Sequence, residues 1–232
     1  MEPVALGRVT TLSPGRVAAW FALAIAMAAL AYGSNAAADT EPGDDVLFQW
    51  STAASAAVLY AIIFAVLLAI ARPVDPTVLG FRRPDSWGKA IGLILAGFVA
   101  IAVAAAVLDA AGLNAGDEQG LVPKDWDPSR AAPFVANFVV VALVAPLVEE
   151  AMFRGVGFAA VRQHWGALAA TAVTAVLFGL AHGLLVALPV LAAFGVVLAV
   201  VRQRTDSIYP PIALHALFNA LALIAGVTGV GS

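Results

Sequence analysis

The chain has 232 residues, of which 62% are hydrophobic and 12% are charged, and its mean hydropathy is +0.95. Soluble globular domains carry about 25% charged residues, so this composition excludes a water-soluble protein. Cysteine is absent, which excludes disulfides, thiolate metal sites and a cysteine nucleophile. The net charge is −3 and there is no basic tract, so we expect no nucleic-acid partner.

Uncharged apolar runs follow one another along the chain, each near the ~20 residues that a helix needs to cross a bilayer. They lie at about 17–33, 48–71, 90–112, 133–148, 167–185, 184–201 and 208–226. We expect an all-α membrane helix bundle of about 7–8 transmembrane helices, forming a single integral membrane domain over residues 1–232. The fifth and sixth runs meet without a loop, so one of them should be broken or re-entrant, with Pro189 as the expected break.

The basic residues give the expected orientation, because Lys and Arg near helix ends are retained on the cytoplasmic side. With the N-terminus in the cytoplasm, ten of the twelve fall on that side: Arg8, Arg16, Arg72, Arg82, Arg83, Lys89, Arg154, Arg162, Arg202 and Arg204. Lys124 and Arg130 fall outside, where the loops are acidic. We therefore expect a cytoplasmic N-terminus.

The first run fits two interpretations. Arg8 and Arg16 precede it and three alanines, Ala36 to Ala38, follow it, as at the cleavage site of a secretory signal peptide. Its length of about 16 residues also suits a short membrane span. We expect a retained helix.

Ionisable groups at membrane depth are costly, so those that persist are candidates for function. Asp109 lies near the end of its run, where it can reach the lipid headgroups. Glu149 and Glu150 are adjacent and so point about 100° apart on a helix, which gives them different tasks. Arg154 lies four residues beyond Glu150, within ion-pair reach, so we expect Glu150 to be held by Arg154 and Glu149 to be free. Alternatively, all three belong to a wetted helix end.

Two later histidines lie in apolar runs. His215 and Asn219 are four residues apart, so they share one helix face about 6 Å apart along the axis. The chain should reverse near Trp165, which lies about 16 residues after Glu149 and 17 before His182. In an antiparallel helix pair, Glu149 and His182 would then lie level and line one cavity. Taken singly, each histidine also fits an interhelical hydrogen bond.

Together these motifs resemble the CPBP family of intramembrane proteases, which includes the type II CAAX prenyl endopeptidases and the bacterial Abi proteins associated with immunity to bacteriocins. The motifs occur in the family's order: Glu149-Glu150-x-x-x-Arg154, then Phe178-x-x-x-His182, then His215-x-x-x-Asn219. The stretch Leu79-Gly80-Phe81-Arg82-Arg83-Pro84 also looks like family members. The motif core spans about residues 133–226, and the first 70 residues add only membrane spans.

The resemblance implies a helix bundle with a polar cavity that opens towards the cytoplasmic side and hydrolyses a peptide bond. It implies that Glu149 activates water with His182 beside it, and that His215 and Asn219 stabilise the oxyanion. Glu150 and Arg154 would be supporting residues. His182, His215 and Glu149 form a candidate ligand set for zinc, although the soluble His-Glu-x-x-His pattern is absent.

The expected activity is therefore that of a CAAX-protease-like intramembrane (metallo)endopeptidase. Its partners would be the lipid bilayer and a membrane-associated protein or peptide substrate, in a bacterial cell membrane. Two alternatives remain: a non-hydrolytic scaffold or immunity protein of the same fold, and a proton-coupled transporter, since Glu and His chains also relay protons. The transporter predicts an internal repeat of helices, which the sequence lacks.

Overall fold

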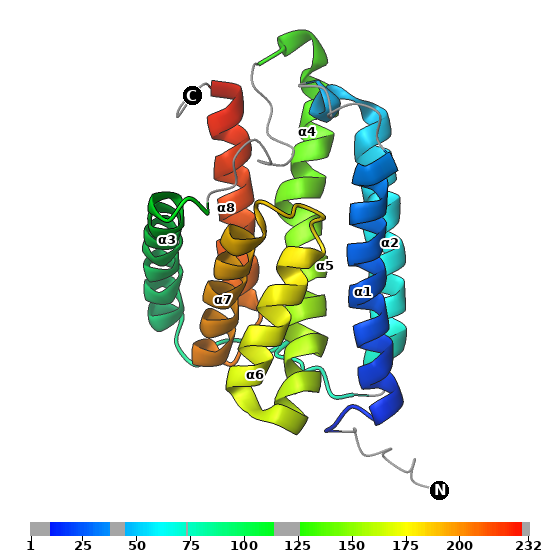
Figure 1. Ribbon diagram of the computed structural model, residues 1–232, viewed down its shortest axis with the longest axis vertical. Coiled ribbons are helices and arrows are strands. Elements are labelled where there is room, and N and C mark those ends of the chain that lie inside the picture. The colour runs from blue at the N-terminus through cyan, green and yellow to red at the C-terminus, as the bar shows by residue number, and fades with distance from the viewer. Residues whose placement is uncertain (1–9, 38–44, 73, 114–125, 229–232) are drawn as a thin grey trace, which may run out of the picture.

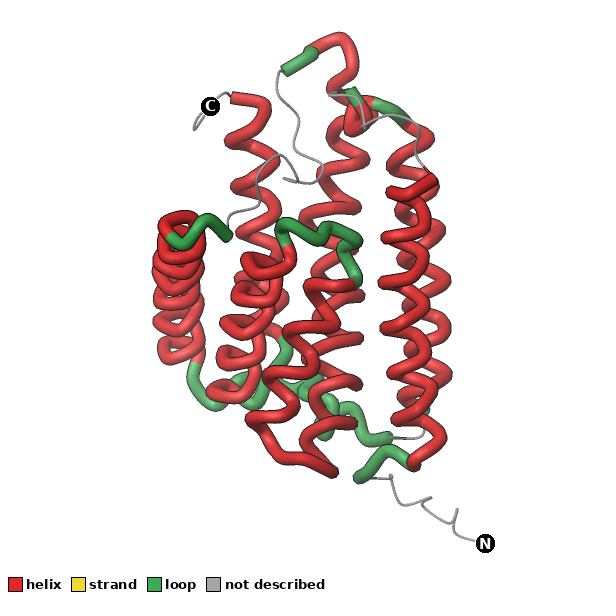
Figure 2. Tube along the Cα trace, viewed as in Figure 1, coloured by secondary structure: helices red, strands yellow, loops and turns green. Residues whose placement is uncertain are grey.

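The computed structural model describes residues 10–37, 45–72, 74–113 and 126–228, and these form helices joined by loops (Figure 2). In chain order the elements are α1 Pro14–Ala37, η1 Val46–Phe48, α2 Trp50–Ala71, α3 Trp87–Ala110, η2 Pro128–Arg130, α4 Ala131–Val139, η3 Val140–Val144, α5 Ala145–Glu150, η4 Ala151–Gly157, α6 Phe158–Leu180, α7 Leu188–Thr205 and α8 Tyr209–Thr228. Here η1 and η2 are 3₁₀ turns, whereas η3 and η4 are π-helical. The prediction of an all-α helix bundle is confirmed.

Within the described residues, six helical stretches are long and apolar enough to cross a membrane, close to the expected 7–8. The longest, residues 128–180, doubles back at Gly166, whose backbone is non-helical with φ +79° (Figure 1). Glycine adopts this conformation at little cost. The reversal expected near Trp165 is therefore confirmed, and it joins the fourth and fifth expected runs into one helical stretch.

The expected break between the fifth and sixth runs is a loop, residues 181–187, and not a kink at Pro189. Pro189 instead lies in the first turn of α7, where backbone N–H groups have no partner within the helix, so a proline there costs no helical hydrogen bond. In Figure 1 this loop lies well below the upper ends of α4 and α8. The second half of α6 and α7 thus form a hairpin that enters the bundle from the end where Gly166 lies and does not extend along its full length.

Helix α1 is packed into the bundle. The indole of Trp20 is fully buried, and its Nε1 donates to Met152 O over 3.0 Å. A Cβ added to Gly157 would overlap that indole, so glycine is what allows the ring to approach. At the far end of α1, Asn35 Nδ2 donates to Gly183 O. These contacts join α1 to the bundle near both of its ends, and retention of this helix stays a prediction.

The N-terminal side of α1, the α2–α3 and α7–α8 connections and the Gly166 reversal lie at one end of the bundle, the lower end in Figure 1. Eight of the ten basic residues assigned to the cytoplasm lie in or next to these segments, and Arg8 lies outside the described residues. Arg154 is an exception, because its side chain is fully buried inside the bundle. The prediction that it faces the cytoplasm is wrong, since the carboxylate of Glu150 holds it inside. Asp109 is exposed in the last turn of α3, as expected for a group near the headgroups.

Candidate active site

The two adjacent glutamates lie on α5, a short α-helix between the π-helical segments η3 and η4. Pro146 accounts for part of this irregularity, because it has no N–H to donate. The N–H of the preceding residue, Ala145, bonds to Val140 O five residues back, so the α-helical hydrogen bonds restart only afterwards. π-helical turns inside α-helices are frequent at functional sites.

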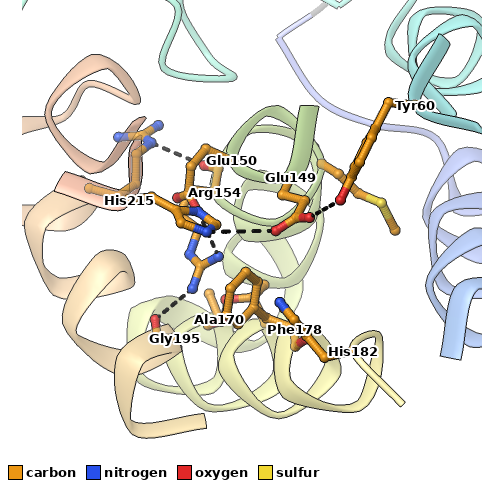
Figure 3. A network of polar contacts seen from close by, with 12 residues as sticks. Tyr60, Glu149, Glu150, Arg154, Ala170, Phe178, His182, Gly195 and His215 are labelled. Carbon is orange, nitrogen blue, oxygen red and sulfur yellow. Dashed lines mark hydrogen bonds and ion pairs between the residues drawn. The ribbon is translucent and has the colours of Figure 1, made fainter. Parts of the chain in front are cut away.

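Glu150 forms the centre of a buried ionic network (Figure 3). Its Oε1 accepts from Arg154 Nη1 over 3.0 Å and lies 3.1 Å from Nδ1 of His215. Arg154 Nη2 also donates to Gly195 O over 2.8 Å, and its guanidinium lies 4.5 Å from the ring centroid of Phe178. The expected Glu150–Arg154 pair is confirmed. Both side chains are fully buried, so the wetted helix end is excluded for this pair.

Glu149 points to the other side of α5 and is not free, contrary to expectation. Its Oε1 accepts a hydrogen bond of 2.6 Å from the hydroxyl of Tyr60 on α2. Its Oε2 lies 3.8 Å from Nε2 of His215, too far for a direct hydrogen bond. His215 therefore stands between the two carboxylates, with Nδ1 facing Glu150 and Nε2 facing Glu149 (Figure 3).

Tyr60 is a residue of this site that the sequence analysis does not identify. It lies in the middle of α2, with apolar residues on both sides for several positions, and its hydroxyl must find a partner there. That isolated hydroxyl was the available signal, but its partner is 89 positions away in the chain.

His182 follows the end of α6 and is half-buried. Its Nδ1 lies 2.7 Å from Phe178 O and must carry the proton there, since a carbonyl only accepts. The ring of Phe178 packs edge-on against His182, with centroids 4.7 Å apart, and against His215 at 5.6 Å. Phe178 thus connects the two histidines. The shared cavity expected for Glu149 and His182 stays a prediction.

Asn219 is bonded to the backbone of the glutamate-bearing span. Its Nδ2 donates to Val141 O over 3.0 Å. Within a helix, that carbonyl would accept from Ala145 or Pro146, but Ala145 bonds to Val140 and the proline has no N–H. Asn219 thus replaces a missing helical donor, and its role towards an oxyanion stays a prediction.

Zinc was expected on His182, His215 and Glu149. Both histidines hold Nδ1 against an oxygen, as zinc-binding histidines commonly do. However, among the residues that the structure describes, no three His, Asp or Glu side chains lie close enough together to hold a metal ion. The expected ligand set is therefore not assembled here, and a zinc site stays a prediction.

The site is closed in this structure, with Glu149 8% exposed and His215 2% exposed. A shallow, open groove of about 490 Å³ lies elsewhere, between the start of α1 and the end of α2, and is lined by residues that include Arg16 and Ile70. The cytoplasm-facing polar cavity stays a prediction. Two buried atoms of the network, Glu150 Oε2 and Arg154 Nε, have no hydrogen-bond partner in the described part of the chain.

Six helical stretches of the described residues are long and apolar enough to cross a membrane, and a buried Glu–His–Arg network joins two of them, which indicates an integral membrane protein with a buried polar centre. Residues 131–221 match the family described as Type II CAAX prenyl endopeptidase Rce1-like. The chain is also 28% identical over 162 residues to the "Putative membrane peptidase YdiL" of Bacillus subtilis (strain 168). That alignment covers 68% of this chain and 66% of the relative, slightly under two thirds of its length. No solved structure matches. The resemblance to the CPBP family is thereby confirmed, and all seven motif residues lie inside the matched region.

Proposed function

We propose that the chain is an intramembrane peptidase that hydrolyses a peptide bond near the cytoplasmic membrane face with a water activated by Glu149. The observation that carries the proposal is the 3.8 Å gap between Glu149 Oε2 and His215 Nε2. Hydrogen bonds to water are about 2.8 Å long, so one water molecule can contact both atoms. Each side chain is also fixed through its other polar atom: Glu149 Oε1 by the hydroxyl of Tyr60, and His215 Nδ1 by the carboxylate of Glu150.

The two carboxylates then have separate tasks. Arg154 offsets the charge of Glu150, with which it forms a direct ion pair, and leaves Glu149 as the proton acceptor. In the proposed step Glu149 takes a proton from the water, the resulting hydroxide attacks the carbonyl carbon, and the peptide C–N bond breaks as the proton passes to the leaving amine. Buried polar groups act strongly on such a step because the site has a low dielectric.

The family resemblance supports His182 beside this water, and His215 and Asn219 near the developing oxyanion. In the structure His182 reaches the cluster through Phe178. For Asn219, one of the two amide hydrogens is used by Val141 O, which leaves the second for substrate.

The proposed substrate is a membrane-associated protein or peptide. A prenylated CAAX protein is one member of that class, and lipopeptides and the tails of membrane proteins are others. The scissile bond would lie on the cytoplasmic side, because we propose that the basic end of the bundle faces the cytoplasm.

Peptidomics of membranes tests the proposal. Membranes that contain the unmodified protein are compared with those that contain Glu149→Gln, and Asp85→Asn serves as the control because its side chain is 89% exposed. A peptide product that is present with the unmodified protein and with Asp85→Asn, and absent with Glu149→Gln, supports hydrolysis. If the three peptide profiles are identical while Glu149→Gln weakens binding of a partner protein, the peptidase proposal is rejected in favour of the non-hydrolytic scaffold. Proton uptake that depends on Glu149 without any product would favour the transporter.

A further inference from the structure

The stretch Leu79–Pro84, which resembles family members, has no task in the proposed hydrolysis. It lies against Arg202, near the end of α7. The side chain of Arg202 is 2% exposed, whereas Arg204, two residues further, is exposed. A buried guanidinium is costly unless it is paired and hydrogen-bonded, so its partners indicate what it does.

The contacts of Arg202 extend in two directions. Its Nε donates to the backbone carbonyl of Arg154 over 3.1 Å, and its Nη1 donates to Asp206 Oδ1 over 3.0 Å. Its Cζ also lies 5.7 Å from the ring centroid of Phe158. One planar side chain therefore joins η4, which follows the two glutamates, to the α7–α8 connection.

Gly80 provides the space for this arrangement. A Cβ on Gly80 would lie 2.6 Å from Cζ, Nε and Nη2 of Arg202, so the guanidinium packs directly on the glycine backbone. Gly80 has φ +84° and its carbonyl accepts from Ile208 N over 2.9 Å. Arg82 Nη1 lies 3.0 Å from the second carboxylate oxygen of Asp206. We call Gly80, Arg82, Arg202 and Asp206 the Arg202 clamp.

The bond to Arg154 O replaces a missing helical bond. In a regular α-helix, Phe158 N–H would donate to Arg154 O, but here it donates to Phe153 O and Gly155 O. Arg202 supplies the donor at the point where η4 ends and the α-helix resumes. The position of this transition from π-helix to α-helix sets the direction in which the Arg154 side chain points.

The clamp therefore reaches both sides of the Glu150–His215 contact. Arg154, whose carbonyl Arg202 binds, forms the ion pair with Glu150. Helix α8, which carries His215, begins at Tyr209, directly after the connection that the clamp holds. We propose that Arg202 is a positioning residue for the Glu150–His215 contact and that the stretch Leu79–Pro84 is the surface that seats it. Its effect on turnover rests on the proposed peptidase function, whereas its effect on His215 does not.

The first measurement uses the His215 ring itself. The chain has three histidines, so ¹⁵N-histidine labelling in detergent micelles gives a small set of signals, and loss of one in His215→Gln assigns it. Arg202→Lys keeps the charge but loses the planar fork that reaches Arg154 O and Asp206 together. Gly80→Ala pushes the guanidinium away. We expect both variants to shift the His215 signal and to leave that of His164 unchanged.

Two matched controls separate this effect from general disturbance. Arg204→Lys makes the same chemical change on an exposed side chain of the same helix. Gly112→Ala carries the same left-handed backbone cost, with φ +72°, but a Cβ there would meet nothing within 4 Å. Neither should move the His215 signal. If Arg202→Lys and Gly80→Ala do not fold, Asp206→Asn is measured in their place. This change should be better tolerated, because the Asp206 side chain is 44% exposed and asparagine can adopt the left-handed φ of 48° found there.

The second measurement is turnover of the product found by peptidomics. A misplacement of about 1 Å can cost up to about 100-fold in rate, so we expect kcat to fall towards that extent in Arg202→Lys while KM is unchanged. A purely structural role would lower the melting temperature but leave the His215 signal and kcat of the folded fraction as they are. That outcome in every folded variant would overturn the proposal. A shifted His215 signal in a protein that hydrolyses nothing would retain the positioning role and reject the peptidase.

Discussion

Replacing Glu150 with glutamine should destabilise the protein far more than the same replacement at Glu149. Glu150 and Arg154 are both fully buried and 3.0 Å apart, so removing the charge of Glu150 leaves a buried guanidinium without its counter-charge. Breaking a buried pair in this way costs about 3–5 kcal/mol. The His215 contact on the same oxygen weakens as well.

Glutamine at position 149 has a smaller cost. Its amide oxygen can still accept from Tyr60, so the change converts a hydrogen bond to a charged group, worth about 1.5–3 kcal/mol, into a neutral one of about 0.5–1.5 kcal/mol. The expected loss is about 1 kcal/mol. Activity should be abolished nevertheless, because the proton acceptor is gone.

Equilibrium unfolding in mixed micelles measures both variants, together with Arg154→Gln and the Glu150→Gln/Arg154→Gln double variant. The double variant should be less destabilised than the sum of the two single changes, because it leaves no unpaired charge. Equal stability of the two glutamate variants would refute the division of tasks between the carboxylates.

Other predictions concern orientation, Tyr60, Asn219 and zinc. The chain has no cysteine, so single cysteines can be introduced as labelling sites. Cysteines at Ser86 and Gln203 should react only from the cytoplasm, and one at Ser129 only from outside. Labelling of Ser86→Cys by an impermeant reagent in intact cells would contradict this orientation. Tyr60→Phe removes the hydroxyl that holds Glu149 and should lower kcat with little change in melting temperature. A change in KM with kcat unaltered would contradict a role of Tyr60 in holding Glu149 as the base. Asn219→Asp removes the donor to Val141 O and should lower kcat by about 10²–10³-fold if the amide also serves the oxyanion, with KM little changed. Removal of metal by a chelator should abolish turnover and added zinc restore it, and full turnover after verified zinc removal would exclude the metal.

The sequence predicted those features that depend on local spacing. Apolar runs located the helices because a bilayer requires long uninterrupted apolar stretches. The Glu150–Arg154 pair followed from its spacing of four residues, and the reversal near Trp165 from the length of the fourth and fifth runs. These features need no knowledge of which helices are neighbours.

Features that depend on helix packing were not predictable in the same way. The Tyr60–Glu149 contact joins two helices whose rotation about their own axes is set by the whole bundle. The prediction that Glu149 and His182 lie level rests on a uniform α-helical rise, from which the π-helical segment η4 between Glu149 and the reversal departs. The irregular backbone carries one sequence signal, Pro146, but its partner Asn219 lies on another helix.

The region that matches the family is not sufficient to build the site. All the motif residues lie within residues 131–221, yet the hydrogen bond that holds Glu149 comes from Tyr60. Trp20 bonds to the backbone of η4, and Gly80 seats the arginine that bonds to it at Arg154. The first 70 residues lie outside the family match, as expected, but Trp20 and Tyr60 within them contact the span that carries the two glutamates. Because these side chains hold the polar centre from outside the matched region, changes in α1, α2 or the stretch Leu79–Pro84 can alter the geometry around Glu149 while every motif residue stays the same.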